Sequence, residues 1–344
     1  MPDIPEIDLY DPQIVTEVHK LISLCGGNPE TFEGGLIIQL IQNSLRLIQE
    51  GHDTGQLKLI TRSLKEMRYA YKIFNQYKGA RCISIFGSAR TPENHPDYMA
   101  AKNFSAGMAS HGWMCITGAA NGIMKAGLEG PQRESSFGLS IRLPFEVPTN
   151  SVIEGDAKLI SFRYFFTRKL MFMSHSDALA AFPGGYGTMD ELFEVLTLIQ
   201  TGKANIMPVV LVEGASGKYW EHWQEYVEKQ LLSNGWICPD DQHLYYIAKS
   251  PEDAVEHIIK FYKKYHSSRY VRDILVLRLT EALTPQQIGL LNLKYKSLIS
   301  SGDIHSYPPY PDETDHLDLP RIAFHHTHRE FGLVRALIND INNF

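Results

Sequence analysis

Three glycine-containing stretches each follow a short apolar run, and they are the parts of this 344-residue chain best suited to chemistry. The stretches are Gly87-Ser88-Ala89-Arg90, Gly118-Ala119-Ala120-Asn121-Gly122 and Pro183-Gly184-Gly185-Tyr186-Gly187-Thr188. Glycine lets a ligand approach the backbone, and a helix that starts at such a loop points N–H groups and the positive end of its dipole at that ligand. The pattern predicts an anion site, most plausibly for phosphate.

The three loops differ in how strongly they indicate a ligand site. Gly87-Ser88 alone is equally typical of a tight turn between a strand and a helix, whereas residues 183–188 place three glycines and a hydroxyl at a helix start. None of the loops has the Gly-Lys-[Ser/Thr] ending of a Walker A motif or the full GxGxxG spacing, which argues against ATP hydrolysis, phosphoryl transfer and hydride transfer. The predicted substrate- and phosphate-binding residues from these loops are Gly87, Ser88, Gly118, Asn121, Gly122, Gly184, Gly185, Gly187 and Thr188.

Charged residues accompany the loops. Glu191 should lie one turn inside the helix that starts near Thr188, where its carboxylate can touch a sugar attached to the phosphate. A Thr188 cap followed by Asp190 and Glu191 in the first turn is also a common structural pattern. Arg168 and Lys169 lie within the apolar segment FRYFFTRKLMFM. Since buried cations need partners, we expect this pair to meet a protein carboxylate or, preferably, a ligand phosphate.

Apolar runs that alternate with helical patterns position these residues. Strands are expected at 82–86, 113–117, 136–143, 177–182 and 207–212. Helices are expected near 95–110, 121–130, 161–175, 189–201, 217–233 and 251–265. Alternation of this kind predicts an α/β fold with a parallel sheet covered by helices on both faces. In such sheets the ligand binds beyond the carboxyl ends of the strands, which is where the three loops fall.

The flanks have a different pattern. Helical periodicity covers 36–50 and 57–77, and the second of these helices should pack on the main domain or on a subunit partner. After the core, a strand at 271–279, a helix from Thr284 and a turn-rich stretch lead to a closing strand and helix. The predicted division is therefore N-terminal helices at 1–78, a core at 79–266 and a small C-terminal α+β extension at 267–344.

Composition restricts the function classes. The 33 Lys and Arg against 39 Asp and Glu give a net charge of −6, so no general positive field would attract nucleic acid or an anionic membrane. The four cysteines are far apart and form no CxxC pair, which is typical of a reducing compartment. The acidic start, Met-Pro-Asp-Ile-Pro-Glu, lacks the features of a signal peptide. We expect a cytoplasmic chain that does not enter a membrane.

The motifs resemble a known family. PGGYGTMDE (183–191) matches the PGGxGTxxE signature of the LOG ("Lonely Guy") phosphoribohydrolases, which are often labelled lysine decarboxylase-like. Arg168-Lys169 resembles the family's Arg-Lys pair, and TGAANGIMKAG (117–127) is similar to its TGGGxGIMEA stretch. The resemblance covers about 78–265. The flanks also resemble those of the longer bacterial nucleotide 5'-monophosphate nucleosidases.

The resemblance implies a Rossmann-like, doubly wound sheet and hydrolysis of the N-glycosidic bond of a nucleoside 5'-monophosphate. Arg168 and Glu191 would be the catalytic pair, with Lys169 and Asn150 among the substrate-binding residues. Asn150 stands about where plant-type members carry a glutamate, and Ala119 and Ala120 replace the usual glycines, so the base preference stays open. No cofactor or metal is implied, and family sites lie at a dimer interface, which predicts a homodimer or larger assembly. The alternative is a nucleotide sensor without turnover.

Other motifs favour structural interpretations. The decarboxylase label needs a Schiff-base lysine, typically in a Ser-x-His-Lys context, and the sequence has none. Ser174-His175-Ser176 is typical of a helix end. His325, His326 and His328 could bind a metal, with His326 and His328 on one face of a strand, but a solvated strand is the preferred interpretation.

Overall fold

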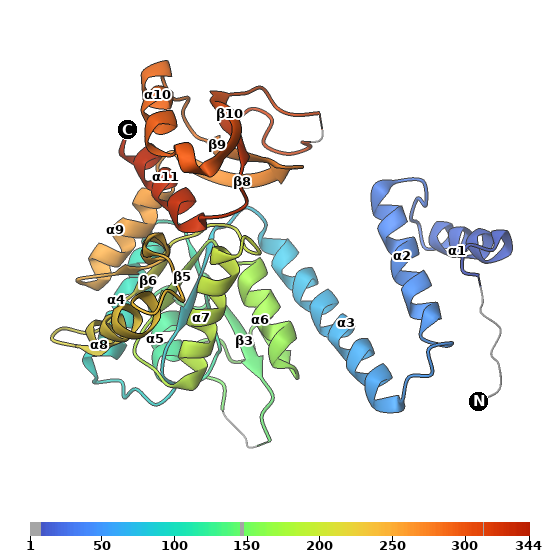
Figure 1. The fold of residues 1–344 in the computed structure, drawn as a ribbon. Coiled ribbons are helices and arrows are strands. Elements are labelled where there is room, and N and C mark those ends of the chain that lie inside the picture. Colours follow the sequence, from blue (N-terminus) through green and yellow to red (C-terminus); the bar gives the residue numbers. More distant parts are fainter. Residues whose placement is uncertain (1–7, 145–147, 312) are drawn as a thin grey trace. The chain divides into compact units, whose positions relative to one another are not determined.

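The computed structural model of the chain describes residues 8–144, 148–311 and 313–344 (Figure 1). The acidic start, for which no signal peptide is predicted, lies outside the described residues. The chain divides into two compact units, Met1–Tyr69 and Ala70–Phe344, and the boundary falls inside helix α3 (Thr54–Phe74). Among the described residues, no helix is both long and apolar enough to cross a membrane.

The first unit is helical. It contains α1 (Pro12–Leu24), α2 (Phe32–Arg46) and most of α3. The helix predicted at 36–50 begins earlier because the Thr31 side chain caps it by accepting a hydrogen bond from the Gly34 N–H. Helix α1, whose N-terminus is capped by the Asp11 carboxylate, was not predicted.

The core of the second unit is a parallel sheet, as predicted. Its described strands are β1 (Cys82–Phe86), β2 (Met114–Thr117), β3 (Ser136–Ile141), β4 (Leu159–Phe162), β5 (Ala178–Ala181), β6 (Val209–Leu211) and β7 (Tyr246–Ile247). They are ordered β4-β3-β2-β1-β5-β6-β7 and every neighbouring pair is parallel. The chain winds outward from β1 in one direction and then returns to place β5 on its other side. The point between β1 and β5 is thus the topological switch point, where such sheets bind ligands.

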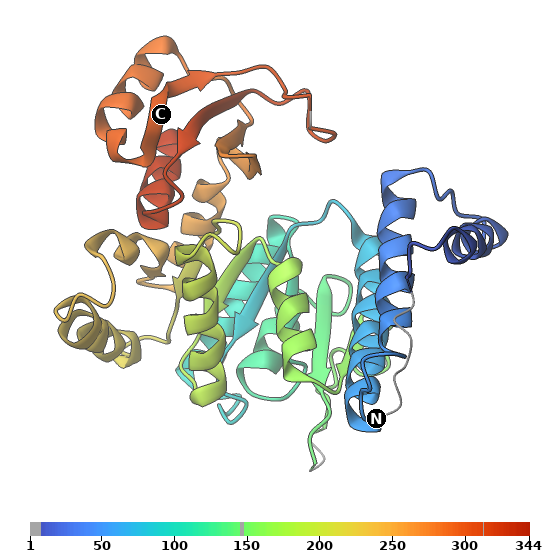
Figure 2. The same ribbon diagram turned by 45° about the vertical axis from the view of Figure 1, so that its right-hand side comes forward.

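Helices cover both faces of this sheet (Figure 2). The helices of the core are α4 (Pro96–Ser110), α5 (Ile123–Glu129), α6 (Phe165–Ser174), α7 (Tyr186–Gln200), α8 (Tyr219–Tyr226) and α9 (Pro251–Phe261). Ile83 and Ile85 of β1 belong to the apolar cluster that includes residues of α4 and α9. On the opposite face the Phe86 ring packs against the Phe172 ring of α6, with centroids 4.8 Å apart. Both faces of β1 are buried, which explains its uninterrupted apolar pattern.

The Rossmann-like arrangement was predicted, but several boundaries differ. The segment expected as one helix near 161–175 contains the edge strand β4 followed by α6, because residues 159–162 pair with β3. The helix expected near 217–233 continues beyond α8 as a π-helical segment, Val227–Leu232. The short strand β7 was not predicted.

A second, antiparallel sheet follows the core. Its strands are β8 (Tyr265–Val271), β9 (Ile274–Leu279), β10 (Ile299–Ser306) and β11 (Arg321–His326), and its helices are α10 (Pro285–Lys294) and α11 (Phe331–Asn343). The strand order is β10-β11-β9-β8. This part belongs to the same compact unit as the core. The helix predicted to end at 265 ends at Phe261, and β8 and β10 were missed, since both have few apolar residues.

Candidate functional site

The loops after β1 and β5 meet at the switch point. The Ser88 N–H donates to the Pro183 carbonyl at 3.1 Å, and the Phe182 N–H donates to the Phe86 carbonyl at 2.8 Å. A cavity of about 720 Å³ opens here. Its lining includes residues 86–90, Met124, Phe165, Arg168 and residues 184–191. The cavity is therefore built by two loops at the carboxyl edge, by the starts of α5 and α6 and by the first two turns of α7.

The start of α7 is open to a ligand. Gly185 is the N-cap residue and no side chain caps the helix. A side chain added at Gly185 or at Gly187 would meet nothing within 4 Å, so the backbone faces open space at both positions. The uncapped N–H groups and the helix dipole provide a place for an anion. The alternative that Thr188 caps the helix is wrong, because α7 begins two residues before Thr188 and its N-cap residue is Gly185.

The loop between β2 and α5 packs against the loop that follows β1. Gly122 has a φ of +62°, and a side chain there would collide with the carbonyl oxygen of Ser88. Ala119 is buried at a φ of +62°, a backbone conformation that costs a non-glycine residue on the order of 1 kcal/mol. Asn150 braces this loop: its Nδ2 donates to the Ala120 carbonyl at 3.0 Å.

Arg168 is held by its own surroundings. Its Nε donates to the Leu139 carbonyl at 2.7 Å, and its guanidinium carbon lies 5.2 Å from the centroid of the Phe172 ring. Gly118 leaves room for the guanidinium, because a side chain there would overlap its Nη2. Burial lowers the pKa of Arg168 to about 10, and Glu191 opposes this shift. Arg168 is thus a fixed cation at neutral pH with little hydration of its own.

Glu191 lies in the second turn of α7, and its side chain is only 11% exposed. Burial raises its pKa to about 7, although Lys169 and then Arg168 act in the opposite direction. A buried carboxyl group with a pKa near neutrality, in a cavity and beside a fixed arginine, is a pattern that clusters at functional sites.

Lys169 is held by carboxylates of α7. Its Nζ lies 2.7 Å from Asp190 Oδ2, 2.6 Å from Glu194 Oε2 and 3.9 Å from Glu191 Oε2. It does not line the cavity. In this structure the ammonium group of Lys169 links α6 to α7 next to Glu191. Its binding to substrate phosphate stays a prediction.

The comparisons with known proteins agree with the motifs. A family model described as "possible lysine decarboxylase" matches residues 107–258. A cytokinin riboside 5'-monophosphate phosphoribohydrolase of Arabidopsis thaliana is 34% identical over 118 residues, which are 34% of this chain and 51% of that relative. These matches, each of which covers less than half of the chain, support the resemblance to the LOG family. The predicted resemblance to this family is confirmed, while the finer resemblance of the flanks to bacterial nucleosidases stays a prediction.

Other comparisons also match only part of the chain. A probable cytokinin riboside 5'-monophosphate phosphoribohydrolase of Oryza sativa subsp. japonica is 31% identical over 121 residues, which are 35% of this chain and 46% of that relative. The chain thus spans about half the length of the curated relatives it matches. A molybdenum cofactor binding protein from Rippkaea orientalis is 21% identical over 53% of this chain and 97% of its own, with a TM-score of 0.37.

The structure brings together part of the predicted LOG-family site. The predicted residues that line the cavity are Gly87, Ser88, Arg168, Gly184, Gly185, Gly187, Thr188 and Glu191. The predicted residues that do not line it are Gly118, Asn121, Gly122, Asn150 and Lys169. Sequence reasoning missed Arg90, Met124 and Phe165 as lining residues. Phe165 had a usable signal, because it precedes Arg168 by three residues and therefore shares its helix face.

The histidine cluster is not the solvated strand that was expected. β11 is mostly buried, and His326 is only 2% exposed. Its Nδ1 lies 2.6 Å from the Tyr270 hydroxyl, and burial lowers its pKa to about 4. Across the described ranges 8–144, 148–311 and 313–344, no three histidine, cysteine, aspartate or glutamate side chains are grouped as metal ligands.

Proposed function

We propose that this chain hydrolyses the N-glycosidic bond of nucleoside 5'-monophosphates and releases the free base and ribose 5-phosphate. The observation that carries the proposal is the placement of Arg168 and Glu191 in one cavity with the uncapped start of α7. The named activity of the plant relatives, phosphoribohydrolysis of a cytokinin nucleotide, supports the same reaction class.

The geometry suits a sugar phosphate. A phosphate at the N–H groups of Tyr186 and Gly187 would lie about 6–8 Å along the helix axis from Glu191, since an α-helix rises 1.5 Å per residue. The ribose would then bridge the two positions. Phosphate binding thereby fixes a part of the substrate that does not react and orients the bond that does.

The chemistry follows from the charges. Cleavage of the C1'–N bond leaves positive charge on the ribose ring, and a carboxylate beside the ring stabilises that charge and orients a water molecule. The water oxygen bonds to C1', one of its protons goes to the departing base through solvent or the site, and the bond electrons leave with the base. Glu191 acts in its ionised form, and Arg168 is assigned to the phosphate and ribose hydroxyl groups.

The wider setting of the reaction is also part of the proposal. Phe165 and Tyr186 line the cavity and are large side chains with much of their surface exposed, which favours a homodimer in which a second copy covers this edge. We place the reaction in the cytoplasm, where nucleoside monophosphates are available. The substrate is the only partner proposed besides the second copy, with no cofactor, metal or nucleic acid.

The test is direct. The purified chain is incubated separately with AMP, GMP, CMP, UMP and IMP, and free base and ribose 5-phosphate are measured by chromatography. Release of both products in equal amounts supports the proposal and ranks the bases. Binding of a nucleotide by calorimetry without any release would contradict hydrolysis and favour the sensor.

A further inference from the structure

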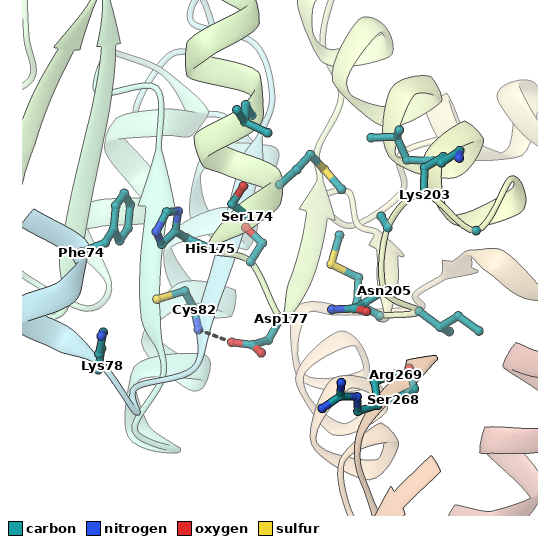
Figure 3. Close-up of a pocket in the computed structure, with 18 of the residues that line it drawn as sticks. Phe74, Lys78, Cys82, Ser174, His175, Asp177, Lys203, Asn205, Ser268 and Arg269 are labelled. Atoms are coloured by element: carbon teal, nitrogen blue, oxygen red, sulfur yellow. Dashed lines mark hydrogen bonds between the residues drawn. The ribbon is translucent and has the colours of Figure 1, made fainter. Parts of the chain in front are cut away.

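A second cavity lies at the opposite edge of the parallel sheet (Figure 3). Its volume is about 660 Å³, within the usual range for small-molecule sites. Its lining comes from the end of α3, the first residues of β1, the ends of α6 and α7, and strands β8 and β9 of the C-terminal sheet. All of these residues belong to the unit Ala70–Phe344. Nothing in the proposed reaction uses this cavity.

Cations predominate around it. Figure 3 shows Lys78, Lys203 and Arg269 on different sides of the cavity. Among the described residues, no carboxylate lies within ion-pair distance of Lys78 or Lys203. Arg269 Nη1 lies 3.4 Å from Asp315 Oδ1, but Asp315 makes its shorter contacts with Arg278. In a chain with a net charge of −6, three cations from three separate elements form a local positive site.

The acidic and imidazole groups of the cavity do not cancel this charge. Asp177 is already engaged, since its Oδ2 accepts the Cys82 N–H at 3.0 Å and its Oδ1 lies 4.0 Å from Arg81. His175 stacks on Phe74 with ring centroids 3.8 Å apart, and burial lowers its pKa, which keeps it neutral. The net charge offered to a ligand is therefore positive.

Most of the remaining lining residues are apolar or carry hydroxyl groups, and Asn75 and Asn205 add amides. Aromatic and aliphatic side chains face the cavity from several elements, namely Phe74, Tyr77, Met173, Tyr270, Leu275 and Phe331. Ser174, Ser176 and Ser268 add hydroxyl groups. Apolar walls with a few convergent cations suit a small organic molecule that carries a multiply charged phosphate, because lysine binds phosphate as a point charge.

The same two helices border both cavities. Arg168 lies in the first half of α6 and Ser174 at its end, while Glu191 lies in the second turn of α7 and Lys203 just after its end. Glu191 and Gln200 are separated by only about 14 Å along α7. The loop after α7 also packs against the start of α11, because Gly202 lies so close to the Phe331 ring that a side chain would not fit.

We propose that this second cavity binds a small organic phosphate and that its occupancy changes the reaction at the opposite edge by shifting α6 and α7. The regulatory half of this proposal rests on the proposed function, whereas the binding half does not. The coupling requires the ligand to favour one position of the two helices over another, since a ligand that binds both positions equally shifts nothing.

Binding is tested by calorimetry of the full chain with phenyl phosphate, which combines a flat apolar ring with a phosphate. The double variant Lys78→Gln/Lys203→Gln should bind it at least tenfold more weakly. The matched control Lys249→Gln/Lys296→Gln, which removes two other exposed lysines, should bind it as the parent chain does. Binding should also persist in Arg168→Ala, which alters only the first cavity. Unchanged affinity in the Lys78→Gln/Lys203→Gln variant, or loss of all binding in Arg168→Ala, would overturn the site.

Inorganic phosphate serves as the second probe. It should bind at least tenfold more weakly than phenyl phosphate, because it cannot use the apolar walls. Equal affinities would overturn the assignment of an organic ligand.

Kinetics test the coupling. With a saturating nucleoside monophosphate, phenyl phosphate should change kcat at least twofold, whereas simple competition in the first cavity disappears at saturation. The change should be absent in Lys78→Gln/Lys203→Gln, whose basal kcat stays that of the parent. A response that persists in this variant would overturn the regulatory role. If the chain released no base at all, the proposed function would fail while the calorimetric result would still decide the binding site.

Discussion

Two buried glutamates in this chain lie beside arginines and yet have opposite properties. Glu313, in the C-terminal part, has a fully buried side chain. Its carboxylate accepts hydrogen bonds from Arg278, from Arg321 and from the Tyr310 N–H, at 2.7 to 3.1 Å. Burial alone would raise its pKa, but these bonds lower it below the ordinary value. Among the described residues, the cation within ion-pair distance of Glu191 is Lys169, at 3.9 Å, with Arg168 farther off, and burial raises the pKa of Glu191 to about 7.

The difference lies in whether protein groups satisfy the buried carboxylate. Glu313 has its acceptor positions satisfied by two guanidinium groups and a backbone amide, which holds the turn-rich segment against β9 and β11. Such a group has nothing left for a ligand. Glu191 is desolvated without equivalent compensation, and it faces a cavity, so a developing positive charge on a substrate would supply the missing partner.

The first prediction tests the proposed role of Glu191 in the reaction. Glu191→Gln should lower kcat for nucleoside monophosphate hydrolysis roughly 10³-fold, because the amide keeps the shape and removes the negative charge that stabilises the transition state. Nucleotide binding, measured by calorimetry, should change little, since the phosphate site at the start of α7 is intact. A variant with full activity would contradict the role of Glu191.

The second prediction tests the contribution of Glu313 to the stability of the fold. Glu313→Gln should lower the free energy of unfolding by about 3 kcal/mol, since it leaves two buried arginines without their shared anion. Denaturant unfolding followed by circular dichroism measures this. The control Glu225→Gln removes an exposed ion pair with Lys229 and should cost less than about 1 kcal/mol. A loss in Glu313→Gln no larger than in the control would show that the buried network does not stabilise the fold.

Glu191 could be singled out from the sequence and Glu313 could not, for a physical reason. Glu191 lies in a contiguous motif next to glycines, so local spacing predicts its place on a helix near a loop. Glu313 lies in a turn-rich stretch, and its partners on β9 and β11 are 35 and 8 residues away in the chain. Pairing of this kind depends on the register of an antiparallel sheet, which the sequence analysis did not predict.

The same limit explains the other differences in the site. The parallel sheet and the three glycine loops could be predicted because alternating apolar runs and helices determine where strands end. The second role of Lys169 could not, because its contacts with Asp190 and Glu194 depend on how α6 packs against α7. Asn150 likewise braces the loop at Ala120, and nothing in its immediate sequence signals this contact.

The third prediction uses the pH dependence of stability to test the raised pKa of Glu191 and the lowered pKa of Glu313. Between pH 4.5, the ordinary pKa, and about pH 7, the folded wild-type chain keeps a proton on Glu191 that the unfolded chain has released. The free energy of unfolding therefore falls as the pH rises through this range. Glu191→Gln should therefore be more stable than the wild type by about 3 kcal/mol at pH 8, with no difference at pH 4.

Glu313 should show the reverse dependence. Its lowered pKa means that the unfolded chain takes up the proton first as pH falls, so its contribution to stability is present above pH 4.5 and is lost in more acid solution. The deficit of Glu313→Gln relative to the wild type should shrink as the pH falls below 4.5. Denaturant unfolding across pH 3 to 8 measures both dependences, and parallel curves for the two variants would refute the distinction between the glutamates.

The fourth and smallest effect concerns Lys169, whose Nζ lies 3.9 Å from Glu191 Oε2 and which does not line the cavity. Because its ammonium lowers the pKa of Glu191, Lys169→Met should move the acid limb of the kcat profile upward by roughly one pH unit from its wild-type position near 7. The rate should recover to within about twofold at pH 9, where Glu191 is again ionised. Lys169→Arg restores a cation between α6 and α7 and should return the limb toward its original position. A merely structural role would instead lower kcat by the same factor at every pH, with no displacement of the limb and no rescue by arginine.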